Sequence, residues 1–329
     1  HIPSTPNTVV RGYLTVEKPP VARVEPEQVV TIDTVSAAGL RLDGPDPVAF
    51  FGTHGIAAGE VLRDAIDIYH HVRPPEGRPA GHVLTGPIAI AGAHPGDVLE
   101  VRILAVTPRV PYGVNTGGPG FGALPHLLGE TATKVIRLDL ERNVALFSEE
   151  IEIPLRPFMG VMAVAPPPSM GFVGSRPPGV YGGNMDLNEL GAGATLYLPV
   201  HKEDALFIVG DGHAVQGDGE VTGTAIEISQ TVTLQFLLHP RRPLTWPRAE
   251  TRTHHITMGM DEDLNLAMSI ALQEAVNFLQ QEKGLSAADA YSLCSLAVDF
   301  EVAEAVNHVN MIHAMIPKSI FKSQAPYWA

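Results

Sequence analysis

The sequence predicts a mainly β protein with an α+β C-terminal part, built from sandwich- or barrel-like domains of short strands plus two helices near the C-terminus. Three observations support this prediction. Glycine and proline, 32 and 29 of the 329 residues, recur as turn residues along the chain. Such frequent turns favour many short strands over a helical bundle. Apolar runs of strand length lie between the turns, and helical spacing of apolar residues occurs only after residue 255.

The first 107 residues are expected to be mostly β. Strand-like segments occupy residues 29–35, 87–90 and 97–106, and turn residues separate the last two. Residues 108–130 are rich in proline and glycine, so we expect a long loop there. We assign residues 1–135 to an N-terminal β-rich domain.

A central β domain is expected over residues 136–250. Residues 152–168 predict a pair of strands, and residues 195–200 predict another strand. Apolar residues alternate strictly from Ile226 to Phe236. Another apolar run of strand type precedes it and ends at Val209. The glycine-rich stretch between these two runs is therefore expected to be the turn of a hairpin.

The C-terminal part, residues 251–329, is expected to be α+β. Apolar residues recur at helical spacing over 261–283, and Gly284 is a helix stop. Ser286 begins a second helix, which carries the core residue Cys294, and one closing strand is expected over 300–315. As the only cysteine, Cys294 excludes an intramolecular disulfide and a multi-cysteine metal site, and it favours a reducing cytoplasm.

The overall charge and hydropathy exclude several classes of partner. The formal net charge is −14, which disfavours nucleic acid and anionic membrane surfaces. No signal-peptide pattern occurs, and no run reaches the ~18 apolar residues of a membrane span. We therefore expect a soluble protein whose partner is a small molecule.

The glycine-rich stretch from Val209 to Glu220 has the highest density of reactive side chains in the sequence. If the preceding strand continues through Asp211, then Asp211 and His213 project to one face, as the first two ligands of a divalent metal must. Asp218 and Glu220 repeat this spacing. Carboxylate with imidazole suits zinc, whereas an all-oxygen set suits calcium. An ordinary structural turn remains an alternative, because Asp-Gly pairs are common turn residues.

Two further candidates precede this stretch. His82 lies at the entrance to a strand, where its side chain can point toward a cleft, and Asp186 lies on a glycine-rich loop as a turn residue or a ligand. No Gly-x-Ser-x-Gly elbow, phosphate-binding loop or dinucleotide fingerprint occurs. A hydrolase with this sequence would therefore have to activate water.

Several long stretches resemble the acetamidase/formamidase family. They include His82-Val-Leu-Thr-Gly-Pro-Ile, Gly182-Gly-Asn-Met-Asp186, Gly210-Asp-Gly-His213 and Gln216-Gly-Asp-Gly-Glu220. The resemblance implies a cytoplasmic homo-oligomer, a dimer or larger, that hydrolyses the C–N bond of short aliphatic amides to ammonia and a carboxylate. Residues 33–78 depart from the family pattern, so a γ-lactam or a bulkier amide remains an alternative substrate.

From the chemistry of these side chains we expect a divalent metal, zinc, held by four ligands: His82, Asp186, Asp211 and His213. Glu220 is the expected general base, Asp218 is expected to orient a ligand, and Asn184 is expected to stabilise the oxyanion together with backbone N–H groups at 182 and 183. The alternative from another class is a non-catalytic β binding module in which the acidic turn holds a structural Ca²⁺.

Overall fold

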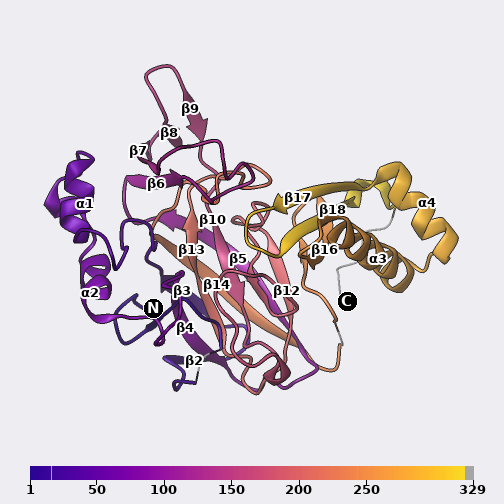
Figure 1. Ribbon diagram of the computed structural model, residues 1–329. Coiled ribbons are helices and arrows are strands. Elements are labelled where there is room, and N and C mark those ends of the chain that lie inside the picture. Colours follow the sequence, from indigo (N-terminus) through magenta and orange to yellow (C-terminus); the bar gives the residue numbers. More distant parts are fainter. Residues whose placement is uncertain (16, 243, 323–329) are drawn as a thin grey trace.

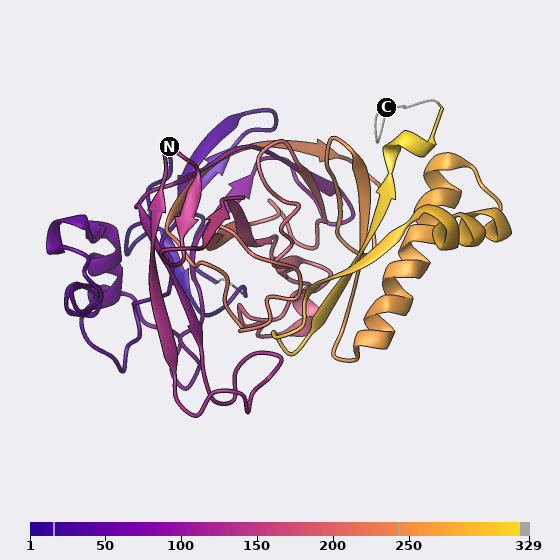
Figure 2. The same ribbon diagram turned by 90° about the horizontal axis from the view of Figure 1, so that it is seen from above.

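The computed structural model describes residues 1–15, 17–242 and 244–322, and most of this part of the chain is built on strands (Figure 1). The prediction of a mainly β protein is confirmed, as is that of two helices near the C-terminus. Figure 2 shows the β-rich body between two helical regions, one from the beginning of the chain and one from its end.

One sheet of six strands carries the central motif. Its order is β1-β4-β13-β10-β11, and β2 pairs in parallel with β4. Its strands are β1 (Val9–Arg11), β2 (Ala22–Val24), β4 (Val83–Ile90), β10 (Phe158–Ala163), β11 (Gly182–Asn184) and β13 (Phe207–His213).

The largest sheet has eight antiparallel strands in the order β17-β18-β16-β15-β12-β5-β14-β3. Its strands are β3 (Val29–Asp33), β5 (Val98–Pro108), β12 (Thr195–Pro199), β14 (Gln230–His239), β15 (Arg248–Glu250), β16 (His254–Asp261), β17 (Asp299–Glu304) and β18 (Asn310–Pro317). Both larger sheets take strands from more than one of the three predicted domains.

A third sheet of four strands projects from the body at the top of Figure 1. It consists of β6 (Tyr112–Gly117), β7 (Ala132–Asp139), β8 (Val144–Leu146) and β9 (Glu152–Pro154). The helices are α1 (Pro47–Thr53), α2 (Arg63–His71), α3 (Leu264–Lys283) and α4 (Ala287–Ala297), with short 3₁₀ turns η1 (Ala58–Glu60), η2 (Pro168–Met170) and η3 (Lys318–Ile320).

The core lies where the two larger sheets pack against each other. Alternate residues of β14, Val232, Leu234 and Phe236, are fully buried, as the two-residue period of a strand requires. Phe236 meets Phe207 of β13 with ring centroids 5.0 Å apart in an edge-on arrangement. This aromatic pair therefore joins the sheet that carries the central motif to the eight-stranded sheet.

The end of α3 and the beginning of α4 lie where the sequence predicts, and α3 begins at Leu264, three residues after the expected start at 261. Asp263 caps α3 by accepting a hydrogen bond from the Asn265 N–H, and Gly284 ends the helix in the left-handed conformation at φ 68°. Ser286 caps α4 in the same way. Gly259 of β16 permits α3 to approach, because a Cβ there would lie 2.2 Å from the Ala267 carbonyl oxygen.

Several local predictions are wrong. Helices α1 and α2 lie in the segment expected to be mostly β, and strand β6 lies within the expected loop at 108–130. Two antiparallel strands, β17 and β18, replace the single closing strand. Strands β9 and β10 do not pair with each other.

The predicted hairpin is also wrong, because β13 and β14 belong to different sheets. Residues 214–229 instead carry the chain from one sheet to the other.

Among the residues described, no helix is long and apolar enough to cross a membrane.

Candidate functional site

Three adjacent strands bring the candidate side chains together. Strand β10 lies between β13, which ends with Asp211 and His213, and β11, which leads to Asp186. Gly160 of β10 faces all three side chains. A Cβ at Gly160 would lie 2.5 Å from Asp186 Oδ1 and 2.9 Å from Asp211 Oδ2. The absence of a side chain at this position therefore provides the space into which the acidic groups converge.

Three of the carboxylates come from residues with unusual backbone conformations. Asp211 has φ 57°, and Asp186 and Glu220 both have φ 44°. The left-handed region is uncommon for residues other than glycine, and each such residue costs about 1–3 kcal/mol unless the surrounding structure holds it. Strain of this kind concentrates at functional sites, and here it directs three acidic side chains toward the ring of His213.

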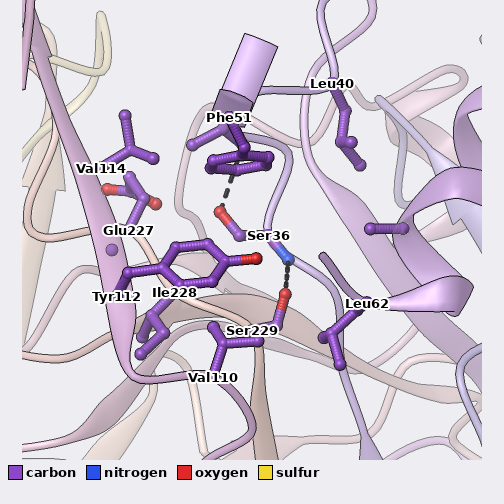
Figure 3. Close-up of a pocket in the computed structure, with 13 residues that line it drawn as sticks. Ser36, Leu40, Phe51, Leu62, Val110, Tyr112, Val114, Glu227, Ile228 and Ser229 are labelled. Atoms are coloured by element: carbon purple, nitrogen blue, oxygen red, sulfur yellow. Dashed lines mark hydrogen bonds between the residues drawn. The ribbon is translucent and has the colours of Figure 1, made fainter. Parts of the chain in front are cut away.

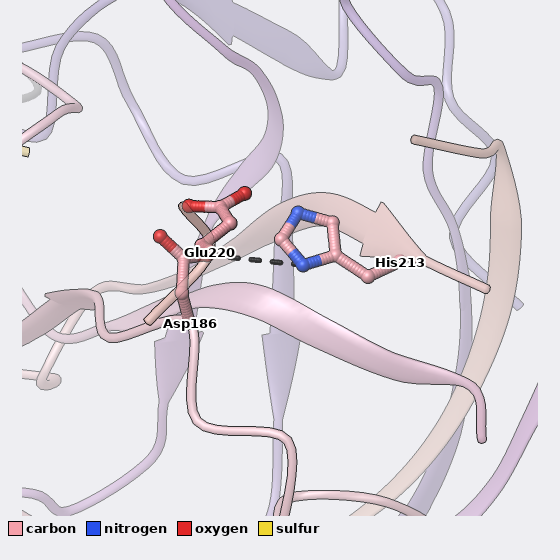
Figure 4. A group of neighbouring side chains, drawn as sticks. All are labelled: Asp186, His213 and Glu220. Carbon is pink, nitrogen blue, oxygen red and sulfur yellow. Dashed lines mark ion pairs between the residues drawn. The ribbon is translucent and has the colours of Figure 1, made fainter. Parts of the chain in front are cut away.

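His213 is the centre of the cluster, and its side chain is 1% exposed. Its Nε2 lies 3.3 Å from Glu227 Oε1 and 3.5 Å from Asp211 Oδ2. Its Nδ1 lies 3.9 Å from Asp186 Oδ1. Figure 4 shows this ring facing the carboxylates of Asp186 and Glu220.

Gln216 fixes which nitrogen of His213 carries the proton. The Gln216 amide nitrogen donates to two carbonyl oxygens, those of Asp186 and Ala303, at 2.8 and 3.3 Å. Its Oε1 must therefore accept from His213 Nδ1, 2.9 Å away. In the neutral ring this leaves the Nε2 lone pair directed at Asp211 and Glu227, which is the arrangement found in metal-ligating histidines.

Burial and mutual repulsion control the charges in the cluster. Burial raises the pKa of Glu220 well above its usual value, and the neighbouring Asp186 raises it further. Burial likewise raises the pKa values of Asp186 and Glu227. Burial alone would lower the pKa of His213, but Glu227 and Asp211 raise it well above 6.5. A cation at the centre would relieve the same repulsion among the acids.

Two overlapping groups could hold a divalent metal: Asp211, His213 and Glu227, or Asp186, His213 and Glu220. In each group the potential ligand atoms lie within 4.8 Å of one another. The proton position on His213 favours the first group, which uses Nε2. In addition, Asp186 Oδ1 is buried and accepts no hydrogen bond among the described residues. The cluster therefore fits a divalent ion that prefers mixed nitrogen and oxygen ligands.

The structure brings together most of the predicted residues. Asp186, Asp211, His213 and Glu220 are all in the cluster. His82 lies at its edge, with Nε2 3.5 Å from Asp211 Oδ2 and Nδ1 3.0 Å from the Ser175 hydroxyl.

Three other predicted groups are positioned differently. Asn184 donates to Asp186 Oδ2 at 2.8 Å. Asp218 lies outside both metal-holding groups and accepts a hydrogen bond from Asn188 at 2.7 Å. The backbone N–H of Gly182 donates to the Gly179 carbonyl oxygen.

Sequence reasoning missed three residues of the site: Glu227, Gln216 and Asn307. Glu227 forms an isolated β-bridge with His213. The available signal was its position between Ile226 and Ile228, because in an extended segment its side chain projects to the side opposite these two buried residues. Asn307, which lies in the connection between β17 and β18, donates a hydrogen bond of 2.7 Å to Asp186 Oδ2. No local pattern in the sequence indicates that contact.

An apolar pocket adjoins the cluster through Glu227 (Figure 3). Its walls come from α1, α2, β6 and the segment before β14. The lining residues include Leu40, Phe51, Leu62, Val110, Tyr112 and Val114, together with Glu227 and Ser229. Glu227 is the only acidic residue among those that line it.

Comparison with known proteins gives consistent results. Residues 77–171 and 174–323 match the model of the acetamidase/formamidase family. An acetamidase structure from Bacillus halodurans has a TM-score of 0.80 and 29% identity, covering 98% of this chain and 99% of that one. An acetamidase from Yersinia enterocolitica has a TM-score of 0.79 and 27% identity, covering 97% and 92%.

A formamidase of Methylophilus methylotrophus is 29% identical over 44% of this chain and 41% of its own length. A Schizosaccharomyces pombe protein is 29% identical over 47% of this chain and 51% of its own. The chain thus spans about half the length of the curated relatives it matches.

Proposed function

The chain belongs to the acetamidase/formamidase family, and on this premise we propose that it hydrolyses the C–N bond of a small, non-peptide amide to ammonia and a carboxylate. The observation that carries the proposal is the buried cluster around His213, where four carboxylates and a second imidazole converge. Burying so many ionisable groups together is costly for stability, and such groups are typical of active sites.

The first step of the proposal concerns the metal. Asp211, Glu227 and His213 Nε2 would hold a divalent cation, zinc in our proposal, with His82 and Asp186 Oδ1 beside it as further candidate ligands. When bound, such an ion polarises a carbonyl oxygen and lowers the pKa of water to about 7. Gln216 would keep His213 in the tautomer that this role needs.

The second step concerns the proton. Water adds to the amide carbonyl carbon, the C–N bond breaks, and one proton must pass from the water to the leaving nitrogen. Glu220 is suited to this transfer, because burial beside Asp186 raises the pKa of its carboxyl group. The ionised form is therefore a stronger proton acceptor toward water, and the acid formed in this way can donate the same proton to the leaving nitrogen. Asn184 and Asn307 hold Asp186 in place by donating to its Oδ2.

The pocket bears on the choice between small and larger substrates. Because Glu227 lies both in the cluster and in the pocket wall, the acyl group of a substrate bound at the cluster would face Phe51, Leu62 and Tyr112. The free volume of about 20 Å³ holds one or two water-sized groups, so a larger acyl group enters only if these side chains move. Two of these residues come from the segment at 33–78. A bulkier amide or a γ-lactam would bury apolar surface there, whereas formamide has no carbon substituent to bury.

The remaining parts of the proposal rest on the sequence and on the family resemblance. The single cysteine favours the cytoplasm. The resemblance implies a homo-oligomer, and zinc is proposed because carboxylate and imidazole ligands together suit that ion.

The test measures ammonia release from formamide, acetamide and longer aliphatic amides, and formation of the ring-opened amino acid from γ-lactams, by protein stripped of metal, before and after zinc is added. We expect activity to depend on zinc and to be abolished in Asp211→Asn and His213→Ala. The matched control is Asp204→Asn, which removes an acid from a surface ion pair with Arg23. Wild-type activity in both site variants would refute the assignment of the site.

The substrate panel decides between the candidates. A kcat/KM that rises with acyl size would support the bulkier substrate, and the opposite trend would support formamide or acetamide. Activity unaffected by metal removal would remove the metal from the proposal. No hydrolysis product from any amide or lactam would favour the non-catalytic Ca²⁺-binding alternative.

A further inference from the structure

A second cluster of potential metal ligands lies outside the site described above. We propose that Glu189, Glu301 and His313 form a separate divalent-metal site that fastens the C-terminal strands to the loop following Asp186. The potential ligand atoms of the three residues lie within 4.8 Å of one another. None of the three belongs to the cluster around His213.

Strand register places two of the ligands on one face. Glu301 of β17 lies directly opposite His313 of β18, so their side chains project to the same side of the sheet. Ile312 and Ala314, on either side of His313, pack with residues of α3. His313 therefore points away from α3 and toward the β core, and the loop that carries Glu189 approaches it from there.

His313 has no hydrogen-bond partner among the described residues, although it is fully buried. Both ring nitrogens are unsatisfied, and so is Glu189 Oε2. His313 Nε2 lies 3.4 Å from Glu301 Oε2 and 3.5 Å from Glu189 Oε2, beyond ordinary hydrogen-bond length. Buried polar atoms almost always have partners, and an ion between His313 Nε2 and Glu189 Oε2 would supply the partner that both atoms lack.

The charges and the ligand types indicate the class of ion. Burial raises the pKa of Glu189 to about 7, with further contributions from Asp218 and Glu301, and burial lowers the pKa of His313 to about 4. A cation would offset the effect on Glu189, because it stabilises the ionised carboxylate, and it would match the state of His313, because it binds the neutral imidazole. One imidazole with two carboxylates suits zinc or a neighbouring transition ion better than calcium.

The position of this second site gives it a structural role. Glu189 follows Asp186 by three residues, and Asn188 between them donates to Asp218 in the turn that carries Glu220. The other two ligands come from β17 and β18, whose connection supplies Asn307 to Asp186. A bound ion would therefore hold together the two segments that position Asp186 and Glu220.

The experiment measures zinc content by elemental analysis of metal-stripped, reconstituted full-length protein, together with the melting temperature with and without zinc. We expect two zinc ions per chain in the wild type and one in Glu301→Gln. Glu301 is suitable because its side chain is 39% exposed, so the variant should fold even if His313→Gln does not. Glu262→Gln, an exposed acid outside the cluster, is the matched control and should retain two.

A background without the first site isolates the second one. In Asp211→Asn, which removes a ligand of the first site, one zinc ion should remain, and zinc should still raise the melting temperature. Combining it with Glu301→Gln should weaken the remaining zinc binding at least about tenfold. The inference is overturned if Glu301→Gln binds as much zinc as the control, or if Asp211→Asn alone abolishes all zinc binding and all zinc-dependent stabilisation.

Discussion

Replacing Gly160 by alanine places one methyl group in the centre of the proposed active site. The new Cβ would lie 2.5 Å from Asp186 Oδ1, and ordinary contact begins near 3.4 Å, so the carboxylate must retreat by about 0.9 Å. Asp211 Oδ2 and His213 Cε1, both at 2.9 Å, must also move. Displacements near 1 Å in a catalytic constellation can cost about 100-fold in rate. We expect kcat/KM to fall by that factor, or about 2.7 kcal/mol of transition-state stabilisation.

The assay is ammonia release with zinc content measured on the same samples. Gly217→Ala is the control, because it adds the same methyl group within the glycine-rich stretch at a position where nothing lies within 4 Å. Circular dichroism and the melting temperature establish that both variants fold. Gly160→Ala with wild-type kcat/KM and zinc content would refute the assignment of Asp186, Asp211 and His213 to one reaction centre.

Three other predictions follow from particular contacts. Gln216→Leu removes the acceptor for His213 Nδ1 and should weaken zinc binding about 10- to 100-fold in a competition titration; unchanged affinity would contradict the tautomer argument. Cys294→Ala should keep wild-type ammonia release while lowering the free energy of unfolding by about 1 kcal/mol in denaturant, since Cys294 is a core residue; loss of turnover in a folded variant would indicate that the thiol takes part in the reaction. Burial, aided by nearby lysines, lowers the pKa of His255 from 6.5 to about 3. As the pH falls from 6.5 toward 3, the unfolded chain takes up a proton on His255 that the folded protein does not. The stability present above pH 6.5 is therefore lost, and the free energy of unfolding decreases by at most about 1.4 kcal/mol per pH unit. His255→Gln should flatten that slope, and an unchanged slope would argue against the buried neutral ring.

The parts of the fold that could be predicted are those set by local chemistry. Gly284 as the end of α3 and Ser286 as the cap of α4 could be predicted because capping depends on a few neighbouring residues. The hairpin between Val209 and Ile226 was wrong because strand alternation says which residues are buried and not which sheet they join. Two strands adjacent in sequence can belong to different sheets when the chain between them crosses the core.

The same distinction applies to the candidate site. Asp211 and His213 could be predicted to project together because they lie two residues apart on one strand. Glu227 could not be assigned to them, because its bridge to His213 depends on how residues 214–229 return to the sheet. Asp218 shares the spacing of Glu220 but lies outside the metal-holding groups, since the turn that separates them directs only Glu220 inward.

The C-terminal strands explain how the strained residues of the site are maintained. The backbone of Gly219 exchanges hydrogen bonds with Ala303 and Ala305, so the end of β17 holds the turn in which Glu220 adopts a positive φ. Gln216 donates to the Ala303 carbonyl oxygen. Asn307 supplies a second donor to the carboxylate of Asp186. Unfavourable conformations persist only where the surroundings supply enough contacts to fix them. The segment from 303 to 307 supplies those contacts, and for this reason the C-terminal part, although distant in sequence from β13, belongs to the active site that we propose.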